Sequence, residues 1–544
     1  MTNDLKLIAS SFDIQGTIAE IVPLGEGLIN DTYRIQTAGA DTPDYVLQHI
    51  NTDVFTNPDI VMHNIDVATS HIRRQLQQEA DTDIRHHVLH FIGLKENPTQ
   101  LYATVEGKTW RVMEFVDHSL TKTEVNADNA RAAGKAFGEF QARLSDVQEP
   151  LDETIKDFHN MEFRLRQLDE ACAANPQNRL DEPEVKTLLE GIRSRSEEMT
   201  LAERLHRQGL LPKRICHCDT KVNNMLFSED GSQVLCVIDL DTVMPSYVFS
   251  DIGDFLRTAA STVAEDCPDL EKIAFRQDIY DAFVEGYLAS ASAFLTPLER
   301  KLIPYAARLF PYMQCVRFLT DYINGDIYYK TQYDRHNLVR AQNQFRYLQC
   351  IDEALPKVRV VEQVNWPEAF PCKPLMVATV EKSDEDIRLN YYIKEQSVRA
   401  VAQRDNENIW EDSCAEFFIL PNPADGIYYN FECNCAGKLL IGAGATRQGR
   451  ERAQQEVTAL VERHSSLGSE PFGEKLGETE WELSLRIPKE AFFKHQFASL
   501  KDVPLLCNIY KCGDKLSVPH FVSLFPIAAE KPDFHRPDCF RLLA

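Results

Sequence analysis

The spacing of apolar residues changes twice along this chain of 544 residues. Near the N-terminus, short apolar stretches alternate with polar residues, which predicts a small sheet. From Asn126 the apolar residues recur every three or four positions, which predicts helices. After a polar, proline-bearing stretch at 355–374 the two-residue period returns. We therefore expect three parts, which span residues 1–116, 117–355 and 366–544.

The first part is predicted to pair a small sheet with one long helix. Strands are expected at 32–37, 45–50 and 110–116, and a helix at 58–76, where the apolar residues share one face. The last strand runs into a linker between lobes, where an adenine base would bond to the backbone. Glu114 and Val116 are therefore candidate nucleotide-binding residues.

The second part is predicted to be mainly helical, with further helices opening at 250–257 and running through 311–329. Two stripes at helical spacing indicate core rather than a site. They consist of Ala133, Phe137, Phe140 and Leu144, and of Ile279, Phe283 and Tyr287.

The third part alternates with period two, which predicts a half-buried antiparallel sheet. Repeated strands separated by turns such as Ala424-Asp425-Gly426 favour a β-sandwich. The alternating residues are Ile387, Leu389, Tyr391 and Ile393; Tyr429, Phe431, Cys433 and Cys435; and Trp481, Leu483, Leu485 and Ile487.

Composition limits the class of protein. Acidic residues outnumber basic ones by 83 to 58, for a formal charge of -25, which argues against a nucleic-acid or anionic-membrane partner. No run of residues approaches a membrane span or a cleavable leader. The 14 cysteines are too sparse for a disulfide framework, so we expect reduced thiols and a cytoplasmic enzyme.

One histidine and three polar residues have the spacing of a phosphoryl-transfer site. His217, Asp219 and Asn224 form H-x-D-x-x-x-x-N, and Asp239 ends the apolar run 234–238. Asp219 is the candidate base that accepts the hydroxyl proton. Asn224 and Asp239 offer oxygen atoms to Mg2+, which the transfer of phosphate from ATP requires. We expect His217 to orient the loop through hydrogen bonds to the backbone, or simply to be a satisfied half-buried histidine.

A glycine turn lies before this site in the sequence. Gly25 and Gly27, followed by Asn30, stand between two predicted strands, so their backbone N–H groups are candidates to bind phosphate oxygens. A plain hairpin is the alternative.

The lysine that many kinases carry on the next strand is absent, and Gln48 stands there. The following helix has no glutamate before Glu79, so both members of the usual ion pair are missing. Either the kinase is inactive, or the phosphates are held by Gln48 or by a basic residue such as Arg73. The intact acidic motif favours the second interpretation.

Four further residues are candidates for binding the phosphate acceptor. Arg317 and Asp321 are four apart on a predicted helix and so share a face. Lys221 and Asp254 lie close to the motif in sequence. Structural ion pairing is the alternative role for each of them.

Several segments resemble the N-acetylhexosamine 1-kinases of the aminoglycoside phosphotransferase and choline kinase group. They are Y-V-L-Q-H-I-N from Tyr45, I-D-L-D-T-V-M-P from Ile238 and R-F-L-T-D-Y-I-N-G-D from Arg317. The resemblance covers residues 10–355. It implies an α+β protein-kinase-like bilobal fold, with a small β-rich N-lobe and a larger helical C-lobe. It also implies ATP-dependent phosphorylation of the anomeric hydroxyl of a sugar.

The third part resembles carbohydrate-binding-module family 9-like domains, through N-I-W-E-D-S-C-A-E-F-F-I-L-P at 408–421 and Y-Y-N-F-E-C-N-C-A-G at 428–437. That resemblance implies a sugar-binding sandwich and hence a glycan ligand. Trp410 is either a stacking platform or a core residue.

Three function classes stay open. The first is the sugar 1-kinase with an appended glycan-recognition module. The second is a kinase of the same fold that acts on choline, homoserine or an aminoglycoside. The third is a non-catalytic glycan-binding protein.

Overall fold

The computed structural model describes residues 2–24, 30–39 and 42–543. The chain forms two compact units, Met1–Leu355 and Pro356–Ala544. Strands β11 (Lys357–Val361) and β12 (Gln363–Val364) already pair with strands of the second unit, so this unit begins before residue 366. Within the described part of the chain, no helix is both long and apolar enough to cross a membrane.

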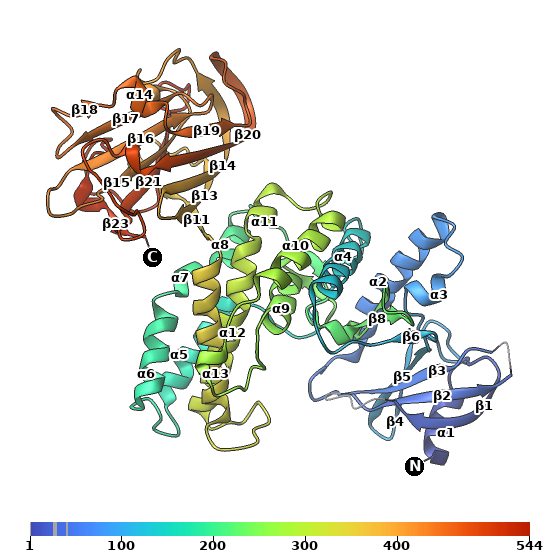
Figure 1. The fold of residues 1–544 in the computed structure, drawn as a ribbon. Helices are drawn as coiled ribbons and strands as arrows, with labels where there is room; N and C mark the ends of the chain where they lie inside the picture. The colour runs from blue at the N-terminus through green and yellow to red at the C-terminus, as the bar shows by residue number, and fades with distance from the viewer. Residues whose placement is uncertain (1, 25–29, 40–41, 544) are drawn as a thin grey trace. The chain divides into compact units, whose positions relative to one another are not determined.

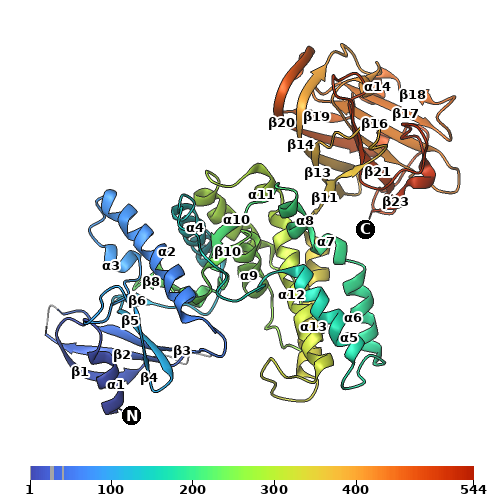
Figure 2. The same ribbon diagram turned by 180° about the vertical axis from the view of Figure 1, so that it is seen from behind.

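The first unit contains two lobes (Figures 1 and 2). Its strands are β1 (Thr17–Pro23), β2 (Thr32–Ala38), β3 (Tyr45–Ile50), β4 (Tyr102–Val105), β5 (Lys108–Glu114), β6 (Ser119–Leu120), β7 (Arg214–Cys216), β8 (Met225–Ser228), β9 (Val234–Val237) and β10 (Met244–Ser246). Its helices are α1 (Thr2–Ser10), α2 (Pro58–Gln78), α3 (Ile84–His87), α4 (Ala127–Arg143), α5 (Met161–Ala174), α6 (Pro183–Arg193), α7 (Ser196–Met199), α8 (Leu201–Arg207), α9 (Phe249–Ala259), α10 (Gln277–Ala291), α11 (Pro297–Lys301), α12 (Ile303–Asn324) and α13 (His336–Ala354).

The N-lobe is an antiparallel sheet of order β1-β2-β3-β5-β4 with a helix on each face. Tyr45 and Leu47 of β3 pack with α1, whereas Val46 and Ile50 pack with α2. This division follows from the two-residue period of a strand. Polar residues in phase with Ile50, such as Gln48, therefore lie on the α2 side.

Helices α4 and α10 pack closely in the C-lobe because glycines line their contact. A Cβ atom on Gly134 would lie 2.1 Å from the carbonyl oxygen of Phe283, and one on Gly286 would lie 2.1 Å from that of Arg131. Both predicted apolar stripes are buried here, which confirms them as core.

The helix predicted at 311–329 has different bounds. Helix α12 begins at Ile303, runs through Pro311 and ends at Asn324, where Gly325 adopts a φ of 102° as the cap. A left-handed cap of this kind favours glycine and stops the helix. Residues 326–329 therefore belong to the following loop and not to the helix.

The second unit is a sandwich of two antiparallel sheets, β11-β13-β14-β20-β19 and β12-β22-β21-β15-β16-β17-β18, with β23 paired to β21. One apolar core combines residues from both sheets. Its other elements are β13 (Leu375–Lys382), β14 (Asp386–Ala400), β15 (Cys414–Ile419), β16 (Tyr428–Asn434), β17 (Leu439–Gly444), β18 (Glu451–Arg452), α14 (Gln455–Thr458), β19 (Glu462–Ser465), β20 (Phe472–Pro488), β21 (Leu506–Cys512), β22 (Phe521–Ser523) and β23 (Arg541–Leu542).

The half-buried pattern expected for β16 is wrong. Asn430, Glu432 and Asn434, predicted to face solvent, are each at most 3% exposed. A second apolar cluster, which includes Phe418, Phe521 and Phe534, packs on this outer face. Strand β16 is therefore buried on both faces, and its two-residue period distinguishes an apolar face from a polar one. The overall prediction of a bilobal fold followed by a β-sandwich is confirmed.

Because each unit has its own core, we expect a chain ending at Leu355 to fold alone. Calorimetry should give one unfolding transition for residues 1–355, matching one of two transitions in the full chain. Loss of cooperative unfolding in the shortened chain would contradict this division.

Candidate functional site

The loop after β7 carries His217 and Asp219 and is held by helix α9. The buried carboxylate of Asp251 accepts hydrogen bonds from the backbone N–H groups of His217 (3.0 Å) and Cys218 (2.7 Å) and from Nε2 of Gln141 (2.6 Å). Cys218 adopts a φ of 64°, a left-handed conformation that costs energy in a non-glycine residue. Asp251, which was not among the predicted residues, therefore stabilises a strained turn.

His217 joins this loop to the end of β9. Its ring is fully buried, and Nε2–H donates to the carbonyl oxygen of Ile238 at 2.8 Å. Its Nδ1 accepts from the backbone N–H of Asp219 at 3.3 Å, which assigns the proton to Nε2. The ring thus orients the loop through backbone hydrogen bonds, as expected.

Asp219, Asn224 and Asp239 are neighbours in the structure. Nδ2 of Asn224 donates to the carbonyl oxygen (2.8 Å) and to Oδ2 (3.1 Å) of Asp219. The backbone oxygen of Asn224 accepts from Ile238 N–H at 2.9 Å, which brings the next residue, Asp239, beside the loop. The motif spacing therefore corresponds to one three-dimensional cluster.

The electrostatics of Asp239 are unfavourable without a cation. Its side chain is accessible to solvent, yet desolvation by the surrounding protein raises its pKa to about 6, and the charges of Asp241 and Asp219 act in the same direction. Asn224 commits its Nδ2 to Asp219 and keeps its Oδ1 for another partner. These hard oxygen donors fit Mg2+.

Lys221 neutralises part of the same cluster. Its ammonium group lies 2.5 Å from Oδ1 of Asp219. Desolvation would lower the pKa of Lys221, but the carboxylates of Asp219 and Asp254 raise it overall. Asp254 also accepts from the backbone N–H of Thr220 at 3.0 Å and lies 3.6 Å from Arg257. Lys221 and Asp254 therefore lie beside Asp219, and their binding of the phosphate acceptor stays a prediction.

A buried arginine on β5 stands beside Gln48. Arg111 donates through Nη2 (2.7 Å) and Nε (3.1 Å) to Oε1 of Gln48, and its Nη1 lies 2.5 Å from Oδ1 of Asp241. Arg111 is 2% exposed and Asp241 is also 2% exposed. Sequence reasoning missed this pair, and its one signal was a charged residue within the apolar strand Trp110 to Val116.

The side chain of Asn30 connects the N-lobe to the same pair. Its Nδ2 donates to Oδ2 of Asp241 (2.8 Å), and its Oδ1 accepts from Asn51 N–H (2.9 Å). The side chain is thus fully engaged within the protein. Gly25 and Gly27 lie outside the described residues. Arg73 has its charge near Glu114. Among the described residues it forms no hydrogen bond with Gln48, and Arg111 is the basic residue that bonds to Gln48.

Strand β5 ends at Glu114, so Val116 lies just beyond the strand that was predicted to reach it. Glu114 bonds His90 through its backbone N–H and through a carboxylate oxygen, both at 2.9 Å. The carbonyl oxygen of Val116 accepts from Ser119. Within the described chain, the N–H of Val116 donates no hydrogen bond, which leaves a backbone donor for an adenine.

Arg317 and Asp321 have different surroundings although both line a cavity of about 220 Å³. Asp321 accepts from the N–H groups of residues 327–329 and from Asn337, so its oxygens hold the loop after α12. The guanidinium of Arg317 lies 6.0 Å from the ring centre of Tyr328 and 5.6 Å from that of Tyr329, and it donates to Oε1 of Gln314 at 3.3 Å. Arg317 is therefore the better candidate for contact with a ligand.

The cavity around Arg317 contains a second cation that the sequence did not indicate. Arg164 lines the same cavity, and burial together with the nearby charge of Arg317 lowers its pKa to about 10. Neither arginine forms an ion pair with a carboxylate among the described residues. Arg164 donates to the carbonyl oxygen of Phe158 and to Oε1 of Gln167, so the cavity is positively charged and also has polar side chains that accept hydrogen bonds.

Two family models match the chain. The model described as phosphotransferase enzyme family matches residues 20–294, and the model described as carbohydrate-binding family 9 matches residues 348–544. The first match is slightly more than half of the chain and includes Asp219, Asn224 and Asp239. The first match lies within the first structural unit and the second match covers the second unit, whereas residues 295–347 of the first unit lie outside both.

Solved structures of both kinds are similar to parts of the chain. A candidate carbohydrate-binding protein from Bacteroides uniformis is 48% identical over 35% of this chain and 87% of that protein, with a TM-score of 0.34. The microcompartment-associated aminopropanol kinase is 13% identical over 64% of this chain and 96% of its own, with a TM-score of 0.45. For the choline kinase of Cryptosporidium parvum the values are 13%, 64%, 90% and 0.40.

The Arg111–Asp241 pair yields a stability prediction. Arg111→Met leaves a buried carboxylate without its cation, so the first unit should lose about 3–5 kcal/mol of unfolding free energy. Arg111→Met/Asp241→Asn, which removes both charges, should lose less. Urea denaturation of the first unit measures both, and equal stability of the single variant and the wild type would contradict the role of this pair.

Proposed function

Because the chain belongs to the phosphotransferase enzyme family, we propose that its first unit transfers the γ-phosphoryl group of ATP to the anomeric hydroxyl of an N-acetylhexosamine. The product is the sugar 1-phosphate. The observation that carries this proposal is the cluster of Asp219, Asn224 and Asp239.

Asp219 accepts the hydroxyl proton in this proposal. Its Oδ1 lies 2.5 Å from the ammonium group of Lys221, and its Oδ2 accepts from Nδ2 of Asn224 at 3.1 Å, so both contacts orient the carboxylate. The anomeric hydroxyl is more acidic than other sugar hydroxyls, so a carboxylate of ordinary basicity is sufficient. Lys221 forms an ion pair with Asp219, and Asp254 accepts a hydrogen bond from Thr220 N–H, so both residues orient the loop.

Asn224 and Asp239 hold the magnesium ion in this proposal. When bound, Mg2+ neutralises charge on the β- and γ-phosphates. The chain's own contribution is to hold two oxygen donors at a fixed separation, through the Ile238–Asn224 backbone bond and His217. In this proposal Mg2+ balances the negative charge of Asp239, and Arg111 balances that of Asp241.

Arg111 supplies the positive charge that the strand lysine provides in other kinases. Gln48, at the lysine position, is the acceptor that aligns the Arg111 guanidinium. Because Gln48 and Asp241 engage the donors of Arg111, its guanidinium acts on the phosphates through its charge and not through direct hydrogen bonds. In this proposal the N–H group of Val116 contacts the adenine of the nucleotide. Asn30 holds Asp241, the partner of Arg111, from the N-lobe.

The acceptor sugar is assigned to the cavity of Arg164 and Arg317. A sugar presents several hydroxyl oxygens and, in an N-acetylhexosamine, one amide oxygen, all of which accept hydrogen bonds from guanidinium groups. Tyr328 and Tyr329 add aromatic faces on which a pyranose ring packs. Because Asp321 bonds to the backbone, it acts by shaping the loop that carries these tyrosines.

The second unit is proposed to bind carbohydrate in a cavity of about 400 Å³ on the outer face of its larger sheet. Trp410, Phe418 and His535 provide ring surfaces there, and Arg450 and Asp514 provide polar groups. Such a mixture suits a pyranose, which has apolar faces and a polar rim. Trp410 is half-buried and lines this cavity, so it combines both roles expected for it.

Incubation of the full chain with Mg-ATP and a panel of acceptors tests the kinase proposal. We expect phosphorus NMR to give a phosphate signal coupled to the anomeric proton of N-acetylglucosamine or N-acetylgalactosamine. A phosphoester on choline, ethanolamine, homoserine or an aminoglycoside would instead identify another acceptor. If no acceptor in the panel supports ATP turnover, the result would favour the non-catalytic alternative.

A matched pair of variants serves as the control. Asp219→Asn should lower turnover by about 10²- to 10⁴-fold, roughly 3 to 5 kcal/mol of barrier. Asp230→Asn alters an exposed carboxylate in the turn between β8 and β9 and should leave turnover unchanged. Equal turnover of the Asp219 variant and wild type would remove Asp219 from the mechanism.

A further inference from the structure

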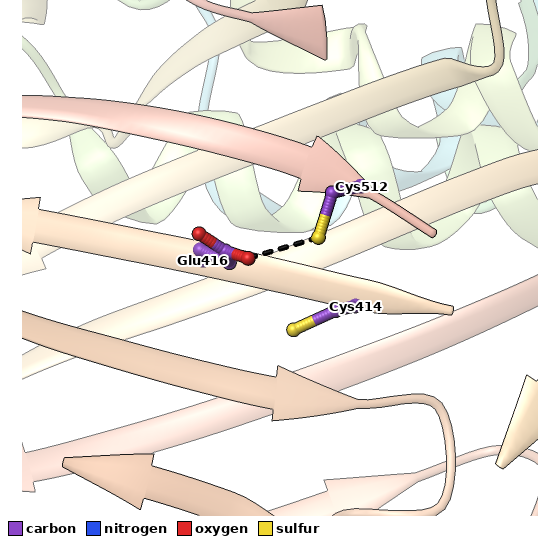
Figure 3. A group of neighbouring side chains, drawn as sticks. All are labelled: Cys414, Glu416 and Cys512. Atoms are coloured by element: carbon purple, nitrogen blue, oxygen red, sulfur yellow. Dashed lines mark hydrogen bonds between the residues drawn. The ribbon is translucent and has the colours of Figure 1, made fainter. Parts of the chain in front are cut away.

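Two thiols and a carboxylate meet on the outer face of the larger sheet in the second unit. Cys414 and Glu416 are two positions apart on β15 and so share a face, and Cys512 of β21 is the register partner of Cys414. Figure 3 shows the three side chains turned toward one another, with the thiol of Cys512 donating to Oε1 of Glu416 at 2.9 Å. One donor atom from each residue lies within 4.8 Å of the others.

A fourth donor next to this group lacks a partner. Glu432 on β16 is the register partner of Glu416, and directly opposed residues bring their side chains together. Its Oε1 accepts from Asn430 at 2.7 Å, but its buried Oε2 has no hydrogen-bond partner. Glu432 is 3% exposed, so solvent does not replace that partner.

No protein cation contacts these carboxylates directly. Among the described residues, no lysine or arginine forms an ion pair with Glu416 or Glu432, although the charges of Arg450 and Lys511 act on them from a distance. Arg450 donates its hydrogen bonds to Oδ1 of Asn430 and to the backbone oxygens of residues 428, 442 and 444. The group therefore has donors for a positive ion and no protein cation bonded to them.

We propose that Cys414, Glu416 and Cys512 bind a thiophilic divalent cation of the zinc type, with Glu432 as the fourth donor. Tetrahedral zinc places sulfur atoms about 3.8 Å apart and sulfur and oxygen about 3.5 Å apart. The donor atoms of Cys414, Glu416 and Cys512 lie within 4.8 Å of one another, so side-chain shifts of about 1 Å bring these three to the required separations. Two metal–sulfur bonds form, and the two thiol protons pass to solvent.

The donor set selects the class of cation. Thiolates disfavour Mg2+ and Ca2+, which take oxygen ligands, and favour zinc and related ions. Glu416 and Cys512 also line the 400 Å³ cavity, so an ion reaches the site from that side. The site lies at the wall of the proposed carbohydrate cavity, and its existence does not depend on the kinase proposal.

Cobalt(II) titration of the reduced full chain tests the site. We expect thiolate-to-cobalt charge-transfer absorption that saturates at one ion per chain and disappears when zinc(II) is added. Cys414→Ser and Cys512→Ser should abolish this absorption, and Glu416→Gln should weaken zinc binding by at least about tenfold. Cys372→Ser, which removes a thiol of the same unit outside the group, should leave it unchanged.

A measurement on the wild type alone avoids misfolded variants. Cys414 and Cys512 are buried, so the measured quantity is the rate of alkylation, followed by mass spectrometry. With zinc(II) present, this rate should fall for Cys414 and Cys512 and stay constant for Cys372. The proposal is overturned by equal rates for Cys414 and Cys512 with and without zinc, by absence of cobalt absorption in the reduced folded chain, or by a Cys414–Cys512 disulfide in the protein as purified.

Discussion

The crowding of carboxylates around Asp239 is the constraint on which the first unit depends. Asp219 has Lys221 beside it and Asp241 has Arg111, whereas Asp239 forms no ion pair with any described residue. Desolvation and its two acidic neighbours raise the pKa of Asp239 to about 6. In the proposed mechanism a divalent cation relieves that repulsion, and the site is complete only when the cation and its anionic nucleotide are bound.

The scaffold around the cluster keeps the carboxylates together against this repulsion. Asp251 on α9 fixes the strained turn at Cys218 through two backbone hydrogen bonds, and His217 joins that turn to the end of β9. From the other lobe, Asn30 and Arg111 both reach Asp241. Each lobe therefore contributes to the position of the acidic residues, and a change in either lobe affects the chemistry.

The sequence was sufficient to predict those features of the fold and the candidate site that depend on neighbouring residues in the chain. The spacing of Asp219, Asn224 and Asp239 reflects one loop followed by a short hairpin, and the bounds of β3 follow from its period. The sequence was insufficient where partners are distant. Arg111 and Asp241 are far apart in the chain, and no periodicity indicates which strand supplies the cation. The burial of Glu432 was missed for a similar reason, since the loops that cover β16 come from other segments.

The role of Asp239 as the metal-binding carboxylate is tested most directly by manganese(II) binding in the presence of ATP, followed by electron paramagnetic resonance. The account predicts that the wild type and Asp230→Asn bind the nucleotide-dependent ion, and that Asp239→Asn weakens this binding by at least about tenfold while remaining folded. Undiminished manganese binding by Asp239→Asn would contradict the account.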